Sequence, residues 1–598
     1  MHDGARGLMD AIRGTEIGLP APGGIAFSLA GGMQRRTLCR KDGLHRPGVD
    51  CHARLPWVSF SCCFFFRKNE AEKRKGKGKG IRMKILFAAS ECVPFIKTGG
   101  LADVVGSLPV ELCRQGEDAR VILPKYRLID GGYRERMQHL FSFTVPFGAE
   151  QKFCGVSTLK ERGVTYYFVD NEEFFYCDAI YGDGLSEGRR FAFFCRAVLE
   201  ILPRIDFVPD VLHLNDWQTG LIAALLKTQY QWDERMRAIR TVFSVHNLNY
   251  QGIFNWAELN ACIGLDGSLF HSEYLEYYGN LSCMKAGLVF ADHVCTVSPS
   301  YAEEIKTEYY GAGLDGLLRK RGATVSGILN GIDTEAYNPA TDRLIGATYD
   351  AQNMGGKAEC KKNLQRVCHL AERPEVPIIG MISRLTPQKG LDLVERVLSD
   401  IMRMDLQMVF LGSGDKRYVD LINWAAWRYE GQISSYVGFH EGLAHRVYAG
   451  SDMFLMPSQF EPCGLSQMIA LRYGSVPIVR ETGGLRDSIR PYNKYTDEGN
   501  GFSFCNYNAH EMLFTIERAV QYYYDDKPMW RRLVWRGMQE DFGWPVSAGR
   551  YIALYKRLSG MPQAAVESPV PAERQHTPPA GNAPQRGPGA GRPGAGRK

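Results

Sequence analysis

The sequence predicts an α/β fold in which two parallel β-sheets, each flanked by helices, face one another across a cleft. Short apolar runs rich in Val, Ile, Leu and Phe recur along the chain, and a loop and a helical stretch follow each run. Runs as continuous as these are typical of strands buried on both faces of a parallel sheet. They fall into two sets, which indicates two Rossmann-like domains and fits a chain of 598 residues, too long for one core.

The two sets of expected strands lie on either side of a junction near "VSGILNGID" (325–333). The first set is "MKILFAAS" (83–90), "ARVILP" (119–124), "DVLHLND" (210–216) and "TVFSVHN" (241–247). The second set is "VPIIGMIS" (376–383), "QMVFLGSG" (407–414), "DMFLMPS" (452–458) and "VPIVRET" (476–482). We therefore expect one domain at 83–327 and a second at 328–540.

The two ends of the chain differ in composition from the middle. Residues 1–82 show no sustained period and finish in a Lys/Gly alternation, and residues 561–598 are rich in Pro, Gly and Ala, so both are expected to be disordered. Met83 opens the first apolar run, and we expect it to be the natural first residue, with 1–82 a start-site misassignment. A basic arm that binds a partner is the alternative for 1–82.

The charge of the chain gives little support to a nucleic-acid partner. Of 72 basic and 66 acidic residues, 16 and 7 lie in 1–82 and 5 and 2 lie in 561–598. Residues 83–560 therefore carry 51 basic and 57 acidic residues, a net charge of −6. A basic surface is confined to the two ends, and we expect neither nucleic acid nor a membrane as a partner of the folded part.

The cysteines and apolar segments indicate a cytoplasmic protein. The 16 cysteines are scattered without Cys-x-x-Cys pairs or zinc-ligand spacing, which favours reduced thiols. The longest apolar run, "WVSFSCCFFF" (57–66), is about half the length that a membrane-spanning helix needs.

One six-residue pattern, Thr-Gly-Gly-Leu-x-Asp, occurs twice, in "IKTGGLADVVG" (96–106) and "RETGGLRDSI" (480–489). Each copy follows an expected strand and opens a helix. Ligands of open parallel sheets lie beyond the carboxyl ends of the strands, and paired glycines allow the backbone to approach a ligand closely. We expect each turn to present unpaired N–H groups to an anion or a sugar oxygen, from opposite walls of the cleft. A tight structural turn is the alternative for either copy taken alone.

Charged and polar side chains follow several other strands. Arg384 and Lys389 lie five residues apart in a loop that enters a helix, a suitable arrangement for a diphosphate. Glu461 precedes a glycine and a helix, where a carboxylate could accept hydrogen bonds from sugar hydroxyls. Asp216 and His246 each end a strand of the first set and predict a carbohydrate pocket.

Several motifs of other protein classes are absent from the sequence. Neither Thr-Gly-Gly turn is a G-x-G-x-x-G fingerprint or a G-x-x-x-x-G-K-[ST] phosphate loop, so an ordinary dinucleotide or nucleoside-triphosphate site is not indicated there. The sequence lacks Asp-x-Asp, which disfavours a metal-bridged nucleotide-sugar site, and it lacks H-E-x-x-H.

The motifs "KTGGLADVVGSLP", "HLNDWQTG", "VHNLNYQG", "SRLTPQKGLD" and "EPCGLSQMIALRYGSVPIVRETGGL" occur together and in this order. In this the chain resembles the bacterial glycogen synthases, relatives of the plant starch synthases, from Met83 to about Tyr555. The resemblance implies the glycosyltransferase-B fold and transfer of glucose from ADP-glucose to the non-reducing end of an α-1,4-glucan such as glycogen. It further implies retention at the anomeric carbon, no metal ion, no cofactor, and a helix at 541–560 that crosses back to the first domain.

The same resemblance implies a role for individual residues. Catalytic roles are implied for His246, Asp216, Glu461, Arg384 and Lys389. Donor-binding roles are implied for Lys97, Gly99, Gly100, Arg384, Lys389, Cys463, Gly464, Thr482, Gly483 and Gly484.

Three other functions remain open on the residues alone. A related enzyme of the same fold could use UDP-glucose, because the sequence does not indicate which nucleotide base the protein recognises. An NAD-linked oxidoreductase would also have two Rossmann-like domains, although neither Thr-Gly-Gly turn that follows an expected strand has its glycine fingerprint. A non-catalytic glucan-binding protein would require an inactive site, whereas every position expected to carry a polar side chain does carry one.

Overall fold

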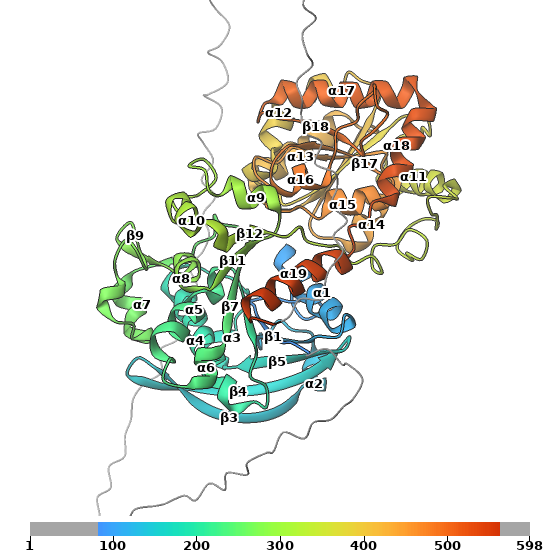
Figure 1. The fold of residues 1–598 in the computed structure, drawn as a ribbon. Coiled ribbons are helices and arrows are strands. Elements are labelled where there is room, and N and C mark those ends of the chain that lie inside the picture. Colours follow the sequence, from blue (N-terminus) through green and yellow to red (C-terminus); the bar gives the residue numbers. More distant parts are fainter. Residues whose placement is uncertain (1–81, 562–598) are drawn as a thin grey trace, which may run out of the picture. The chain divides into compact units, whose positions relative to one another are not determined.

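The computed structural model describes residues 82–561 (Figure 1). The predicted extensions at 1–82 and 561–598 lie outside the described residues, apart from Arg82 and Met561. Each of the eight expected strands is present, and the two sets belong to two separate sheets, as predicted. We refer to residues 82–327 as the N-terminal half and to residues 328–561 as the C-terminal half.

The N-terminal half contains a nine-stranded sheet in the order β12-β11-β7-β6-β1-β2-β5-β4-β3. Its strands are β1 (Lys84–Ala88), β2 (Asp118–Pro124), β3 (Gln138–Phe147), β4 (Glu150–Glu161), β5 (Val164–Asp170), β6 (Val211–Asn215), β7 (Arg240–Val245), β11 (His293–Thr296) and β12 (Val325–Gly327). A small second sheet consists of β8 (Ile253–Phe254), β9 (Glu276–Tyr277) and β10 (Asn280–Ser282). The helices are α1 (Gly100–Arg114), α2 (Gly131–Arg136), α3 (Glu172–Phe175), α4 (Gly184–Ile201), α5 (Trp217–Gln229), α6 (Glu234–Ala238), α7 (Trp256–Ile263), α8 (Cys283–Phe290), α9 (Pro299–Glu304) and α10 (Asp315–Arg321).

One edge of the large sheet differs from the expected parallel arrangement. Strands β3 and β4 pair antiparallel with one another, and β4 pairs antiparallel with β5. Arg162 and Gly163, with φ of 46° and 84°, form the two-residue turn between β4 and β5. Positive φ at both positions is the geometry of a type I′ hairpin, which matches the twist of the strands that it joins.

The C-terminal half contains a six-stranded, fully parallel sheet in the order β15-β14-β13-β16-β17-β18. Its strands are β13 (Ile378–Ile382), β14 (Gln407–Gly412), β15 (Ile433–Val437), β16 (Met453–Met456), β17 (Val476–Arg480) and β18 (Phe502–Phe504). The helices are α11 (Gly355–Val367), α12 (Leu391–Ile401), α13 (Lys416–Arg428), α14 (Glu441–Gly450), α15 (Ser466–Arg472), α16 (Gly483–Ser488), α17 (Ala509–Asp525), α18 (Lys527–Gln539) and α19 (Trp544–Leu558).

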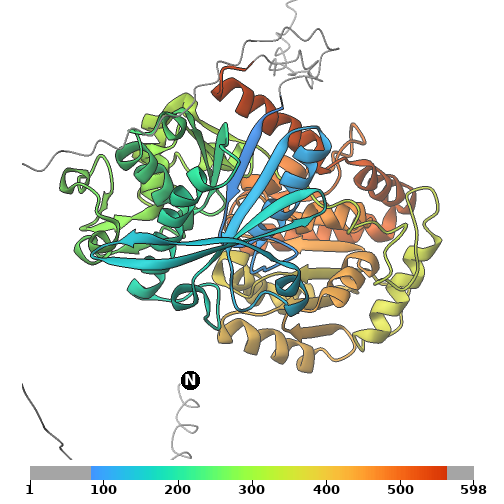
Figure 2. The ribbon, with the colours of Figure 1, turned by 90° about the horizontal axis from the view of Figure 1, so that it is seen from below.

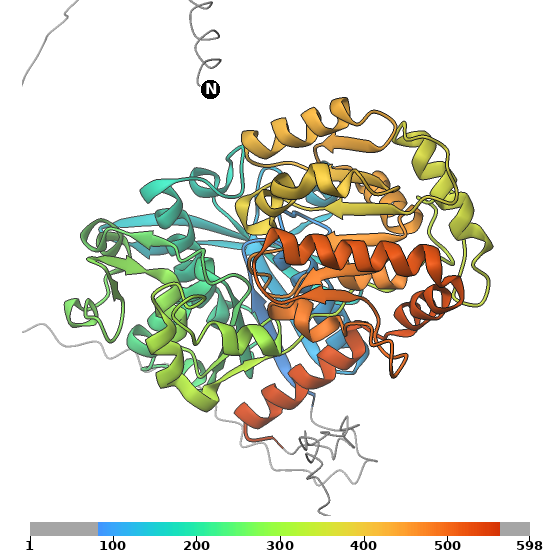
Figure 3. The same cartoon turned by 90° about the horizontal axis from the view of Figure 1, so that it is seen from above.

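Alternate residues of these strands enter different cores, as the two-residue period of a strand requires. Ile379 and Met381 of β13 pack in a core with α12 and α17, whereas Ile378 belongs to the cluster that continues into the N-terminal half. Helices α12 and α17 lie side by side on their face of the sheet (Figure 3). Helix α12 places its apolar residues at three- and four-residue intervals, which buries one side of it.

The last helix, α19, packs against α1 of the N-terminal half (Figures 1 and 2). Tyr555 of α19 lies within 2.6 Å of Nδ1 of His213 in β6, and Oγ of Ser547 donates to the carbonyl of Leu329 at 2.5 Å. Within residues 82–561, no helix combines the length and the apolar character that crossing a membrane demands.

Candidate active site

A buried ion pair joins two of the predicted site residues. Lys389 closes the short turn between β13 and α12, and Glu461 lies in the loop after β16. Nζ of Lys389 is 2.6 Å from Oε2 of Glu461, and the two side chains are only 14% and 9% exposed. Oγ of Ser458 donates to the same carboxylate oxygen at 3.0 Å. The pair therefore presents a fixed cation and a fixed carboxylate at the carboxyl end of the second sheet.

Arg384 links the two halves of the molecule. This exposed side chain precedes Lys389 in the same loop, and its Nη1 donates to the hydroxyl of Tyr250 at 3.0 Å. Tyr250 lies four residues after His246 in the N-terminal half. The guanidinium is therefore held against the segment that carries His246.

Asp216 and His246 meet at the carboxyl ends of β6 and β7. Oδ1 of Asp216 accepts a hydrogen bond from the backbone N–H of His246 at 2.7 Å, and Nε2 of His246 lies 3.0 Å from Oδ1 of Asn215. Burial raises the pKa of Asp216 to about 7 and lowers the pKa of His246 to about 4. His246 is consequently neutral near pH 7, and Asp216 is close to half-protonated, so both can exchange hydrogen bonds with sugar hydroxyls.

The first Thr-Gly-Gly turn is held by Glu91, a buried carboxylate that follows β1. Glu91 accepts hydrogen bonds from the N–H and hydroxyl of Thr98, at 2.5 and 2.9 Å, and from the N–H of Gly99 at 3.3 Å. Nζ of Lys97 pairs with Asp103 at 2.8 Å. A Cβ placed on Gly100 would lie 3.9 Å from Leu465, so this turn faces the segment that follows Glu461.

Lys97 and Thr98 also line a cavity of about 580 Å³. The rest of its wall is largely apolar and includes Phe95, Ile96 and Tyr181. The first turn thus opens onto a space large enough for a ligand.

Both turns differ from the expectation of unpaired N–H groups: Glu91 accepts those of Thr98 and Gly99 in the first turn, and the second turn, at Thr482, Gly483 and Gly484, is occupied as well. The N–H of Gly483 donates to the carboxylate of Glu304 at 2.9 Å, and the N–H of Gly484 donates to the carbonyl of Glu461 at 3.1 Å. A Cβ on Gly484 would lie 2.1 Å from the carbonyl oxygen of Cys463, so the turn needs glycine for packing against this loop. These N–H groups position the Glu461 loop and are not free for a ligand.

Cys463 and Gly464 complete the loop. Cys463 is 6% exposed, and burial raises the pKa of its thiol to about 12. Cys463 is therefore an uncharged thiol at neutral pH, a small side chain close to Glu461 in the same loop.

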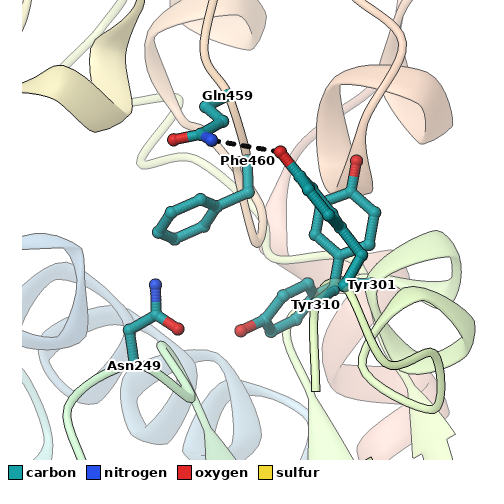
Figure 4. A pocket seen from close by; sticks show the side chains of 6 residues that line it. Asn249, Tyr301, Tyr310, Gln459 and Phe460 are labelled. Atoms are coloured by element: carbon teal, nitrogen blue, oxygen red, sulfur yellow. Dashed lines mark hydrogen bonds between the residues drawn. The ribbon is translucent and has the colours of Figure 1, made fainter. Parts of the chain in front are cut away.

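A cavity of about 240 Å³ lies between the two halves beside this loop (Figure 4). Phe460, the neighbour of Glu461, and Asn249, three residues after His246, face one another across it (Figure 4). Tyr309 and Gln459 close its rim through a hydrogen bond of 3.1 Å. Aromatic faces together with amides and hydroxyls are suited to a sugar ring.

The structure thus brings Lys389, Gly483 and Gly484 into contact with Glu461, and it joins Asp216 with His246. Arg384 contacts Tyr250, which lies four residues after His246 in the chain. Glu91 and Glu304, which hold the two turns, were missed by the sequence analysis. Glu91 could have been found, because it follows β1 as the other candidates follow their strands, whereas nothing local marks Glu304, whose partners lie 178 and 179 residues away.

Comparison with known proteins places the chain in a family. Residues 84–320 match the model of the starch synthase catalytic domain, and residues 369–532 match that of glycosyl transferases group 1. A glycogen synthase of Bacillus cereus is 51% identical over 476 residues, covering 80% of this chain and 100% of the relative. A glycogen synthase of Geobacillus thermodenitrificans is 52% identical over 476 residues, covering 80% and 98%.

Solved structures agree with these matches. The catalytic domain of starch synthase IV from Arabidopsis thaliana, bound to ADP and acarbose, is 34% identical with a TM-score of 0.75, covering 80% of this chain and 100% of that one. A sucrose-phosphate synthase from Thermosynechococcus elongatus shares the fold at 15% identity and a TM-score of 0.52.

The two sheets, the charged groups at their carboxyl ends and these matches define a glycosyltransferase of the glycosyltransferase-B fold. The chain belongs to the glycogen synthase family.

Proposed function

We propose that the protein transfers glucose from ADP-glucose to the non-reducing end of an α-1,4-glucan, with retention at the anomeric carbon. The buried Lys389–Glu461 pair carries this proposal. Breaking the bond between glucose and diphosphate leaves negative charge on the phosphate and positive charge on the sugar, and fixed groups of opposite sign stabilise both. A relative solved with ADP, the product that ADP-glucose leaves behind, supports the choice of nucleotide.

Each site residue has a proposed role. Arg384 and Lys389 hold the diphosphate, and Asp216 and His246 hold the glucose and assist catalysis. Glu461 lies by the sugar ring. The loops at Lys97, Gly99 and Gly100 and at Cys463 and Gly464 enclose the donor, and the turn of Thr482, Gly483 and Gly484 supports the Glu461 loop from behind.

The proposed reaction takes place on one face of the sugar. The bond from the anomeric carbon to the phosphate oxygen breaks, and the 4-hydroxyl oxygen of the acceptor forms the new bond on the same side. The departing phosphate receives the proton of that hydroxyl. A carboxylate nucleophile would instead leave a covalent glucosyl-enzyme. Trapping such an adduct would contradict the proposal.

Closure of the cleft around the donor belongs to the same proposal, because water must be excluded to favour transfer over hydrolysis. The contact between Arg384 and Tyr250 and the contact between Tyr309 and Gln459 cross the cleft and support it.

The test is transfer of radiolabelled glucose from ADP-glucose to glycogen, with UDP-glucose measured in parallel. We expect ADP-glucose to have the higher kcat/KM. Preference for UDP-glucose would identify a related transferase of the same fold, and absence of transfer from both donors would identify a glucan-binding protein.

The segment boundaries and cellular location are also proposals. We propose a first domain at 83–327, a second at 328–540 and a crossing segment at 541–560, supported by the end of the first sheet at Gly327 and by the packing of α19 on α1. Free cysteines throughout residues 82–561 support a reducing, cytoplasmic location.

A further inference from the structure

Helix α9, which follows β11 in the N-terminal half, makes several polar contacts with the C-terminal half. The N–H and hydroxyl of Ser300 donate to the carboxylate of Asp487 in α16, at 2.8 and 2.6 Å. At the other end of α9, the carboxylate of Glu304 accepts from the hydroxyl of Thr482 at 3.1 Å and from the N–H of Gly483 at 2.9 Å. The second Thr-Gly-Gly-Leu-x-Asp motif is therefore bound through its Thr, its first Gly and its Asp to one short helix of the opposite half.

The carboxylate of Glu304 accepts hydrogen bonds in this contact. It is half-buried, and no ion pair found within residues 82–561 includes it. Burial raises the pKa of its carboxyl, while the bonds from Gly483 and Thr482 act in the opposite direction. A carboxylate in this position is stabilised mainly by the turn that it holds.

The turn at Thr482–Gly484 also fixes the position of Glu461. The carbonyl oxygen of Glu461 accepts the N–H of Gly484 at 3.1 Å, and it would lie only 2.0 Å from a Cβ placed on Gly483. The side chain of Glu461 is bonded to Lys389 at 2.6 Å. A displacement of the turn must therefore move the backbone of Glu461 and, with it, the ion pair.

Residues 298–304 also contact the loop that carries Glu461 and the loop that carries His246. Oγ of Ser298 donates to the carbonyl of Pro462 at 2.5 Å, next to Glu461. The hydroxyl of Tyr301 accepts the N–H of Leu248 at 3.0 Å, two residues after His246. Residues 298–304 thus hold the loop of the first half and the loop of the second half in one arrangement.

We propose that Glu304 is a positioning residue for glucosyl transfer: from the N-terminal half it holds the Thr482–Gly483 turn, and through that turn it sets the place of Glu461 and Lys389 against Asp216 and His246. The proposal rests on the roles proposed above for these four residues. Because Glu304 acts through the ion pair and touches no reacting atom, its removal changes the rate of transfer more than the binding of the donor.

The experiment compares Glu304→Ala and Glu304→Gln with Glu303→Ala as the matched control. Glu303 is the exposed neighbour on α9, and within residues 82–561 its carboxylate forms an ion pair with Lys306 alone. We expect Glu304→Ala to lower kcat for transfer from ADP-glucose about 10- to 100-fold, with KM for ADP-glucose changed less than about threefold. Glu304→Gln retains an oxygen that accepts the N–H of Gly483 and should recover kcat to within about fivefold of the wild type. Glu303→Ala should match the wild type.

A double variant separates positioning from folding. In a Lys389→Ala background, where the ion pair is already absent, Glu304→Ala should lower kcat by less than about threefold further, because the two changes remove the same arrangement. Multiplicative effects would overturn the proposal, as would a lowered melting temperature with unchanged kcat in Glu304→Ala. Failure of the proposed function is distinguishable, since it would appear as absence of transfer by the wild type.

Discussion

Replacing Lys389 with methionine should affect activity and stability for two different reasons. Loss of one preorganised charge that stabilises a developing anion lowers kcat by about 10²–10³-fold, equivalent to about 2.7–4 kcal/mol of barrier. Stability falls as well, because Glu461 is only 9% exposed and loses the cation 2.6 Å away. Removing one partner of a buried ion pair destabilises proteins by about 3–5 kcal/mol, and we expect the lower end because Ser458 still donates to the carboxylate.

The double variant Lys389→Met/Glu461→Gln distinguishes these effects. Removal of the stranded charge should restore most of the lost stability in urea denaturation, whereas transfer of labelled glucose from ADP-glucose should remain at or below the level of the single variant. Recovery of activity in the double variant, or a Lys389→Met enzyme with kcat within threefold of the wild type, would refute a role for the cation in catalysis. A fall in activity without loss of stability would refute the reasoning from burial.

Three further predictions concern other parts of the site. The pKa of Asp216 is about 7 in the folded protein and 3.8 is its ordinary value, so the folded state retains a proton that the unfolded state releases between about pH 4 and 7. The stability of the wild type relative to Asp216→Asn, measured by denaturation, should therefore fall as the pH rises through this window, by up to about 1.4 kcal/mol per pKa unit. A stability difference that does not depend on pH would contradict the raised pKa. Gly99→Ala should raise KM for ADP-glucose but keep the wild-type melting temperature, since the nearest atom to the new Cβ is 4.0 Å away. Gly484→Ala should lower the melting temperature by several degrees, because a backbone carbonyl oxygen lies 2.1 Å from the new Cβ. Equal melting temperatures of the two variants would show that the two turns do not differ. Tyr555→Phe removes the hydroxyl 2.6 Å from buried His213 and should destabilise the protein by about 1–3 kcal/mol in urea denaturation with kcat unchanged, a result that a loss of activity at full stability would contradict.

The sequence predicts the two sheets well because their strands are buried on both faces. Runs such as residues 376–383 and 407–414 are continuously apolar, and this pattern is local and strong. The antiparallel edge was not predicted, because β3 places mainly exposed and half-buried residues along its length. The Arg162–Gly163 turn between β4 and β5 is a hairpin signal, but of a weaker kind than Asn-Gly or Asp-Gly.

The site was predictable as a set of strand ends but not as a network of contacts. The position rule for parallel sheets led to Asp216, His246, Arg384 and Lys389, each of which follows a strand. The rule does not say which charges pair, and the ion pair between Lys389 and Glu461 joins residues 72 positions apart. Contacts of this range depend on packing between loops of different strands, which no local pattern encodes.

The two Thr-Gly-Gly turns show how one local structure serves two purposes. In both, a glutamate carboxylate accepts the threonine hydroxyl and the N–H of the first glycine, Glu91 in the first turn and Glu304 in the second. Glu91 belongs to the same loop as its turn, so the first turn is complete within the N-terminal half and faces a cavity. Glu304 comes from the opposite half, so the second turn is complete only when the two halves are in contact. The repeated motif therefore does not indicate two equivalent ligand sites, because the carboxylate that occupies the N–H of the first glycine comes from the same half in the first copy and from the opposite half in the second.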